Sequence, residues 1–197
     1  MTFESERFCV VDVETTGLNT KKDEIIAIAV LPVEGFKVKF SEHFFSLVRA
    51  ERFDPKSVRY HGITMSDLKD APTFEDIAPT LMDLISGSIV VGYATYIDVE
   101  FLKRAFKKKL GIKLKVERYV DIAELEVWLI RKRGMAVTFR LDFDSLLKMY
   151  GVEDSIRHSA LGDAYATALI FLKQLSQLAD YGLGVVDLVR IGRRLML

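Results

Sequence analysis

Residues 10–17 decide the fold, and they read Val10-Val11-Asp12-Val13-Glu14-Thr15-Thr16-Gly17. The apolar run that leads into them, residues 8–11, predicts a strand buried on both faces. Side chains alternate along a strand, so Asp12 and Glu14 are expected to share one face. Two carboxylates roughly 4 Å apart repel by about 4 kcal/mol near a protein surface. A divalent cation held by oxygen ligands would turn that repulsion into attraction, so the stretch predicts a metal site if other segments supply further ligands.

Length, composition and charge limit the architecture and the partners. The chain has 197 residues, 50% of them hydrophobic, which is enough for one domain with a full core. Lys plus Arg and Asp plus Glu number 28 each, so the formal net charge is zero. A chain without net charge has no global field to attract a polyanion. Nucleic acid would therefore have to bind through local patches or through bound metal.

The same composition bears on the compartment. No apolar run approaches the ~18 residues of a membrane span, and the N-terminal residues do not have the pattern of a signal peptide. The one cysteine, Cys9, lies in the first expected strand, where it is expected to be a small buried hydrophobe. We therefore expect a cytoplasmic protein with no membrane partner.

The order of apolar segments predicts an α/β fold. Strands are expected at residues 8–11, 25–31 and 36–48, the last with a bend near Ser41-Glu42. No helix separates these three strands, so they are expected to be antiparallel. Further on, helical periodicity alternates with short strands at residues 88–93 and 116–120. This pattern predicts a mixed five-stranded sheet flanked by helices.

The domain organisation follows from a break near the C-terminus. Residues 1–181 are expected to form one domain, and Gly182-Leu183-Gly184 then interrupts the chain. The tail, residues 182–197, is amphipathic. It is expected to pack on its own domain or to lie at an interface with a partner or a second copy.

Two more aspartates and one histidine stand where ligands collect in open sheets. Asp98 follows an expected strand and Asp163 lies in the first turn of a long helix, and both positions are strand-to-helix or loop-to-helix junctions. The alternative interpretation is that each aspartate only stabilises a helix N-terminus. His158 precedes Asp163 by five residues. A single histidine is more often structural than catalytic, but one near a carboxylate site can act as a base near neutral pH.

Three motifs, in this order, resemble those of the DEDDh (DnaQ-like) 3′–5′ exonucleases, a family that includes the proofreading epsilon subunit of DNA polymerase III. Residues 12–18 resemble the first motif, Gly92 to Leu102 the second, and residues 158–164 (His158-Ser159-Ala160-Leu161-Gly162-Asp163-Ala164) the third. His61-Gly62-Ile63-Thr64 is similar to a loop of the same family. The resemblance covers about residues 8–178.

The resemblance implies a ribonuclease-H-like fold and two bound Mg²⁺ or Mn²⁺ ions. The metal ligands that it implies are Asp12, Glu14, Asp98 and Asp163. It also implies that His158 is the general base that deprotonates the attacking water. Thr15, Thr16 and Leu18 match positions that contact the terminal nucleotide and its 3′-hydroxyl. The implied reaction is phosphodiester hydrolysis from the 3′ end, with DNA favoured and proofreading as a role. The implied partners are single-stranded DNA or RNA and a polymerase or a second copy of the chain.

One position departs from the family pattern. The second motif of the family reads Gly-His-Asn, whereas this chain has Gly92-Tyr93-Ala94. Ala94 cannot make the side-chain hydrogen bond expected of an asparagine. No metal ligand is lost, so activity is expected to survive, while substrate positioning is in question.

Other interpretations stay open on sequence grounds. Aspartyl-phosphate phosphatases also place an aspartate after a strand, but they require a second aspartate where this chain has Glu14. A catalytically weak or silent module bound to a polymerase or a nucleic-acid end is the other alternative. The basic runs, Lys107-Lys108-Lys109 with Lys113 and Lys115 and Arg131-Lys132-Arg133, could guide a nucleic-acid backbone or could be solvated helix ends.

Overall fold

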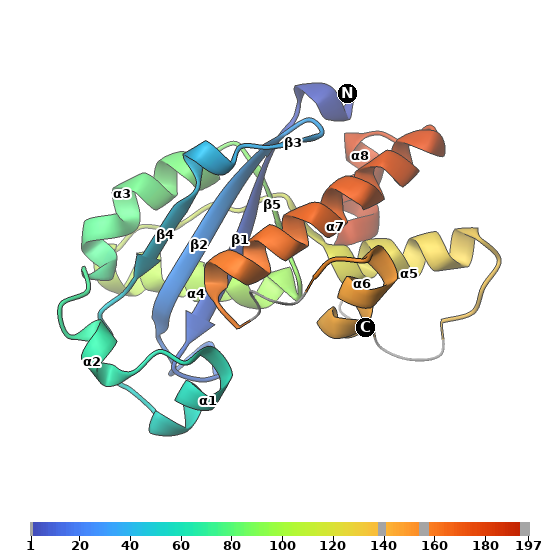
Figure 1. Ribbon diagram of the computed structural model, residues 1–197. Helices are drawn as coiled ribbons and strands as arrows, with labels where there is room; N and C mark the ends of the chain where they lie inside the picture. Colours follow the sequence, from blue (N-terminus) through green and yellow to red (C-terminus); the bar gives the residue numbers. More distant parts are fainter. Residues whose placement is uncertain (1, 138–140, 154–157, 194–197) are drawn as a thin grey trace.

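The computed structural model describes residues 2–137, 141–153 and 158–193. Its centre is a mixed sheet with helices on both faces (Figure 1). The long strands are β1 (Arg7–Thr15) and β2 (Ile25–Glu34), which pair antiparallel. On the other side of β1 lie β5 (Ile89–Gly92) and β6 (Tyr119–Asp121), which continue the sheet in parallel. The strand order is β3-β2-β1-β5-β6, and β4 also pairs with β2.

The sheet has six strands in the described residues, so the expected number of five was wrong. The segment expected as one bent strand at 36–48 forms two short strands, β3 (Lys37–Val38) and β4 (Phe44–Leu47), separated by the 3₁₀ turn η2 (Phe40–Glu42). The interruption lies opposite Pro32 of β2, whose carbonyl accepts a hydrogen bond from the Lys39 amide at 2.9 Å. Proline has no N–H to donate in return, so a continuous ladder cannot form at this point.

Helices cover the two faces of the sheet in separate groups. One face carries α3 (Phe74–Ile85) and α4 (Thr95–Leu110), and the other carries α5 (Ile122–Lys132), α6 (Phe143–Tyr150) and α7 (Ala160–Asp180). The short helices α1 (Val58–His61) and α2 (Met65–Leu68) lie in the connection between β4 and α3. Along β1, Phe8 and Val10 belong to the core under α7, while Cys9 and Val11 belong to the core under α3 and α4. The strand is therefore buried on both faces, as its sequence predicts.

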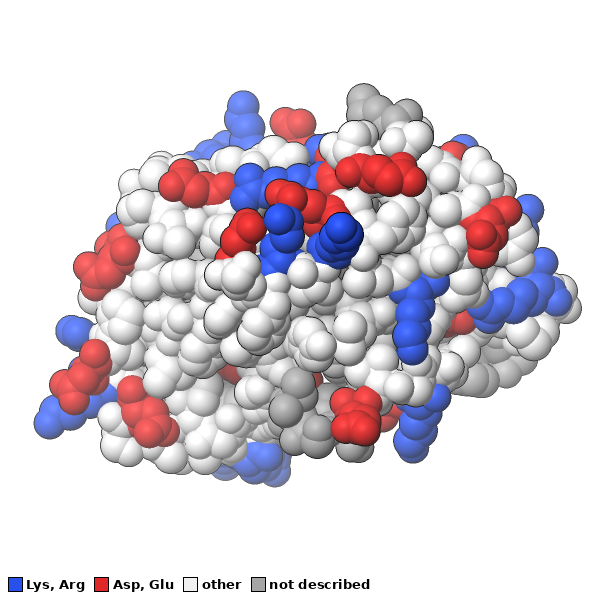
Figure 2. Space-filling model, turned by 45° about the horizontal axis from the view of Figure 1, so that its top comes forward, with Lys and Arg blue, Asp and Glu red and all other residues white. Residues whose placement is uncertain are grey.

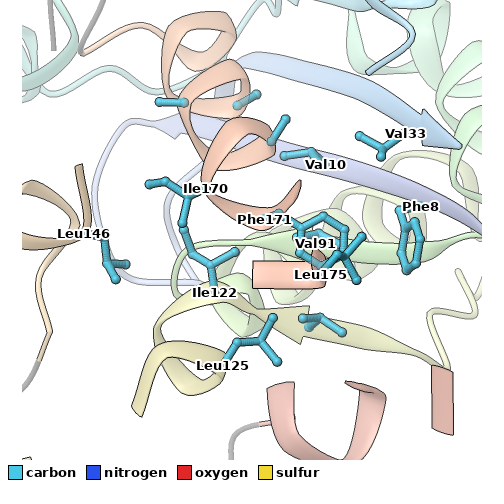
Figure 3. Packing of buried hydrophobic residues seen from close by; sticks show 14 of the residues in the cluster. Phe8, Val10, Val33, Val91, Ile122, Leu125, Leu146, Ile170, Phe171 and Leu175 are labelled. Atoms are coloured by element: carbon cyan, nitrogen blue, oxygen red, sulfur yellow. The ribbon is translucent and has the colours of Figure 1, made fainter. Parts of the chain in front are cut away.

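Small side chains bring α7 close to the sheet. Ala160, Ala164 and Ala168 recur every four residues on one side of α7 and are buried, and α7 lies against β2 and β1. Larger residues fill the core toward the other end of the helix, where the Phe171 and Phe8 rings meet edge to face with centroids 5.0 Å apart (Figure 3). This packing fixes the first turn of α7 over the C-terminal end of β1.

The tail helix α8 (Val185–Gly192) lies against α5 and β6. Its apolar residues Val185 and Leu188 are buried. Gly192 approaches β6 so closely that an added Cβ would lie 2.6 Å from a Val120 side-chain carbon. Residues 194–197 of the tail lie outside the described residues. Within those residues, no helix combines the length and the apolar character that crossing a lipid bilayer would require.

Candidate metal centre

Three carboxylates meet where β1 ends. Asp12 and Glu14 have the same strand parity as Phe8 and Val10, so they point toward the face that α7 covers. Asp163 comes from the first turn of α7, which begins after the cap residue Ser159. Carboxylate oxygens of Asp12, Glu14 and Asp163 all lie within 4.8 Å of one another, and the three residues are half-buried.

The donor set suits a hard divalent cation. Carboxylate oxygens are the ligands that Mg²⁺, Mn²⁺ and Ca²⁺ prefer. Three negative charges this close repel one another, and the N-terminal end of α7 offsets only part of that repulsion. Asp12, Glu14 and Asp163 can therefore hold a metal ion.

Asp98 borders this group without joining the compact set of three. It lies in the first turn of α4 and is 7% exposed. Burial, together with the negative charges of Asp121 and Glu14, raises the pKa of Asp98 well above its ordinary value, although hydrogen bonds from the backbone amides of Val13 and of Asp98 itself oppose the rise. The Asp98 carboxylate therefore lies beside the last residues of β1, close enough to Glu14 for the two negative charges to repel each other.

His158 is exposed and stands immediately before the cap of α7. Its φ angle is 65°, in the left-handed region. In the described residues, one other non-glycine residue has a positive φ, Ala94 at 52°. Such a conformation costs on the order of 1–3 kcal/mol and often marks a functional site. Both strained residues precede the helices that carry Asp163 and Asp98.

The conformation of Ala94 gives the departure from the family motif a structural meaning. Ala94 is the N-cap of α4, with φ 52° and ψ 36°, and its side chain makes no capping bond. Asparagine tolerates the left-handed region better than alanine and is also among the best N-cap residues. A cavity of about 150 Å³ opens beside Ala94 and Asp121. The alanine thus leaves both a strained backbone and empty space next to the acidic residues.

The turn after Glu14 is closed by its own hydrogen bonds. The Thr15 hydroxyl donates to the Gly17 carbonyl at 2.7 Å, and the Thr16 amide donates to the Glu24 carbonyl at 2.9 Å. The Thr16 hydroxyl is buried and accepts from the Glu24 amide at 3.0 Å. Leu18, by contrast, is 87% exposed. Of the three residues expected to contact a nucleotide, Leu18 presents the largest apolar surface to solvent.

Sequence reasoning missed Asp121 as a member of this charged site. Asp121 is 4% exposed, ends β6 and caps α5 by accepting a hydrogen bond from the Ala123 amide at 2.9 Å. Its charge acts on Asp98. Ligands collect at the carboxyl ends of parallel strands, and this rule applies to β6 as well as to β1. Applied to the expected strand before Asp121, the rule would have predicted this residue.

The expected basic run on α4 is in large part neutralised by acidic residues. Lys108 forms an ion pair with Glu24 at 3.0 Å, and Lys109 pairs with Glu51. Figure 2 shows Lys and Arg interspersed with Asp and Glu, without a continuous basic surface in that view. The charges of Lys108 and Lys109 are therefore committed to contacts within the protein.

Comparison with known proteins gives one family and a consistent set of relatives. A family model described as Exonuclease (RNase_T) matches residues 9–171. DNA polymerase III subunit epsilon of Aquifex aeolicus is 32% identical over 179 residues, which are 90% of this chain and 85% of that protein. The PolC-type DNA polymerase III of Thermotoga maritima is 30% identical over 184 residues, which are 92% of this chain but 13% of the polymerase. The chain thus spans about an eighth of that relative's length.

Solved structures share the fold. The nuclease domain of 3′hExo, a DEDDh family member solved with rAMP, superposes with a TM-score of 0.75 at 16% identity, covering 90% of this chain and 95% of that one. Exonuclease X in complex with 5′ overhanging duplex DNA gives a TM-score of 0.70 at 20% identity, covering 94% and 99%. The mixed sheet with helices on both faces is therefore the ribonuclease-H-like fold of these exonucleases.

Proposed function

The chain belongs to the exonuclease family whose model matches residues 9–171, and from that premise we propose that it is a metal-dependent 3′–5′ exonuclease. It removes nucleotides from the 3′ end of nucleic acid by hydrolysing phosphodiester bonds, with DNA as the favoured substrate and proofreading as the role. The observation that carries the proposal is the group Asp12, Glu14 and Asp163, whose oxygens lie within 4.8 Å of one another.

The proposed cofactors are two Mg²⁺ or Mn²⁺ ions held by Asp12, Glu14, Asp98 and Asp163. Such a pair supplies a nucleophilic hydroxide and stabilises charge on the attacking and leaving oxygens. Asp98 is the most deeply buried of the four proposed ligands, whereas Asp12, Glu14 and Asp163 are half-buried. The cluster itself repels a phosphate, and bound cations remove this barrier in a protein without net positive charge.

His158 is proposed as the general base. Two observations support this role: the side chain of His158 is exposed to solvent, and its neighbour Ser159 caps the helix that carries Asp163. An imidazole titrates near neutral pH, so it can take a proton from the attacking water. The left-handed backbone at His158 supports a positioned residue, because strain of this kind persists only where the surroundings require it.

Thr15, Thr16 and Leu18 are proposed to bind the terminal nucleotide. The exposed Leu18 side chain offers an apolar contact to a base or a sugar, and the turn that precedes it is closed by the hydrogen bond from Thr15 to Gly17. The proposed partners are a single-stranded 3′ end and a DNA polymerase. Two of the relatives are DNA polymerases or subunits of one, which supports this assignment. A cytoplasmic location is part of the same proposal.

A weak or silent module is the second candidate, and Ala94 is the observation that favours it. The residue has no polar side chain, and it borders a cavity that Asp121 also lines. The carboxylates are all present, however, so we expect reduced positioning rather than loss of chemistry.

The test is release of labelled nucleotide from single strands labelled at either end. With Mg²⁺ or Mn²⁺, 3′-labelled DNA is expected to release mononucleotide at once, while 5′-labelled DNA shortens in steps. Matched RNA strands report the sugar preference. Absence of release from both DNA and RNA with either metal would contradict the enzyme proposal.

A further inference from the structure

The turn expected to seat the terminal nucleotide is held from outside by α4. Residues 15–18 belong to a longer loop that ends at Asp23 and Glu24, and these two acidic residues carry the contacts. The Asp23 carbonyl accepts a hydrogen bond from the Arg104 guanidinium at 2.6 Å. The Glu24 carboxylate pairs with Lys108 at 3.0 Å. Arg104 and Lys108 lie four residues apart on α4, so both side chains extend toward the loop from the same face of the helix.

Asp23 transmits this contact to the turn. Its carboxylate accepts a hydrogen bond from the Asn19 amide at 2.8 Å. It also lies against Gly17, where an added Cβ would meet the Asp23 carboxylate oxygen at 2.5 Å. The Asp23 side chain thus fixes the positions on both sides of Leu18, while its carbonyl is fixed by Arg104.

Glu24 transmits the second contact. Its backbone is paired with Thr16 in both directions, at 2.9 Å and 3.0 Å. Its carboxylate also accepts from the amides of Glu51 and Arg52 at 2.8 Å and 3.2 Å. The carboxylate is therefore surrounded by donors, and it ties Thr16 to α4 and to the segment after β4.

We propose that Arg104 and Lys108 are positioning residues for the 3′-terminal nucleotide, acting through Asp23 and Glu24 on the Thr15–Leu18 turn. The inference rests on the proposed function and adds a role that the motifs of the family do not contain. α4 carries Asp98 at its first turn and these two cations one to three turns later. One rigid helix therefore holds both a carboxylate of the candidate metal centre and the nucleotide turn, which keeps the scissile bond in register with the metal site.

The competing explanation is that the basic run guides the nucleic-acid backbone by charge. The two explanations differ in substrate. A binding site for the terminal nucleotide contacts both an oligonucleotide and the p-nitrophenyl ester of thymidine 5′-monophosphate, which has no backbone beyond one phosphate. Basic residues that bind the nucleic-acid backbone affect binding of the oligonucleotide alone. Lys107 is the matched control, because it is exposed in the same run and has no ion pair in the described residues.

The experiment compares Arg104→Met, Arg104→Lys, Lys108→Met and Lys107→Met on both substrates. We expect Arg104→Met and Lys108→Met to raise KM about fivefold for both substrates with kcat within about twofold, because a looser seat weakens binding more than chemistry. Arg104→Lys should recover part of the loss, since a lysine keeps a charged donor but not the fork geometry. Lys107→Met should leave both KM values unchanged.

The contrary outcomes are distinct. Unchanged KM in both Arg104→Met and Lys108→Met would overturn the inference. So would a rise confined to the oligonucleotide and shared by Lys107→Met, which is the signature of a charged guide. A fall in kcat at constant KM in both variants would overturn it too, because it shows a loss of active protein rather than of positioning. If the unaltered protein hydrolyses neither substrate, the proposed function fails and the inference fails with it. Should Arg104→Met not fold, Lys108→Met and Arg104→Lys decide the question.

Discussion

The carboxylate of Asp163, at the start of α7, lies within 4.8 Å of the carboxylate of Asp12, near the end of β1. The contact depends on the alanines of α7, which let the helix sit directly on β2 and β1. A candidate cation-binding group is thus assembled from two segments that are far apart in the chain. The stability of the protein and the chemistry of this site are linked, because the same packing that buries the core also brings like charges together.

Divalent metal is expected to stabilise the folded protein. At about 100 times its dissociation constant, a ligand that binds only the native state adds roughly 2.7 kcal/mol to the free energy of unfolding. Thermal unfolding with Mg²⁺, Mn²⁺ or a chelator measures the effect as a rise in Tm. Asp163→Asn should lose most of the rise, whereas Asp70→Asn, at an exposed position away from the cluster, should keep it. A Tm indifferent to saturating metal would contradict the metal site.

Ala94→Gly is expected to raise the free energy of unfolding by about 1 kcal/mol, because glycine adopts the left-handed backbone without the cost that a Cβ imposes. Ala94→Asn should also stabilise, through the backbone and through a new N-cap. Chemical denaturation measures both. Ala105→Gly, within the same helix, is the control and should lower stability by about 1 kcal/mol or more. If Ala94→Gly and Ala105→Gly were equally destabilising, the strained backbone at Ala94 would be excluded.

The contribution of Glu24 to stability is expected to depend on pH. Burial raises the pKa of Glu24, but hydrogen bonds from Lys108 and from the amides of Glu51 and Arg52 outweigh it, so the pKa lies below its ordinary value of 4.5. A lowered carboxyl pKa contributes stability above the unfolded value, and that contribution is lost as the pH falls through the folded value. The difference in unfolding free energy between the unaltered protein and Glu24→Gln should therefore be constant near neutral pH and shrink below pH 4.5. A difference that grew on acidification would contradict the ion pair.

Tyr150→Phe is expected to destabilise the protein by about 1–3 kcal/mol, because it removes a donor from a buried carboxylate. Glu126 is 1% exposed and accepts hydrogen bonds from the Tyr150 hydroxyl and from the Gln174 side chain at 3.2 Å. This network joins α5, α6 and α7. Tyr181→Phe, at a residue that is 46% exposed, is the control. Equal, small effects from both substitutions in chemical denaturation would show that the Tyr150 hydroxyl is dispensable.

Local patterns predict those parts of the fold that depend on a short stretch of chain. The two-residue period of β1 places Asp12 and Glu14 on one face, and the helix that follows His158 brings Asp163 forward in its first turn, as the motifs indicate. The count of strands was wrong because Pro32 of β2 acts on its neighbour across the sheet, and pairing across a sheet is not visible in the sequence of the interrupted segment.

The ion pairs between distant residues could not be predicted from the sequence either. Lys108 and Glu24 are far apart in the chain, and nothing local marks them as a pair. The basic run was therefore interpreted as a candidate guide for nucleic acid, although Lys108 and Lys109 are committed to Glu24 and Glu51. The left-handed backbone of Ala94 was equally hidden, because glycine and asparagine adopt this conformation routinely and alanine does not.

The most direct test of the central claim is the rate of 3′-nucleotide release from single-stranded DNA at saturating Mg²⁺ for the unaltered protein, Asp12→Asn, Asp163→Asn and Asp70→Asn. The account predicts metal-dependent release by the unaltered protein and by Asp70→Asn, and a loss of about 100-fold or more when either clustered carboxylate is neutralised. Folded Asp12→Asn and Asp163→Asn proteins that release nucleotide at the unaltered rate would contradict it.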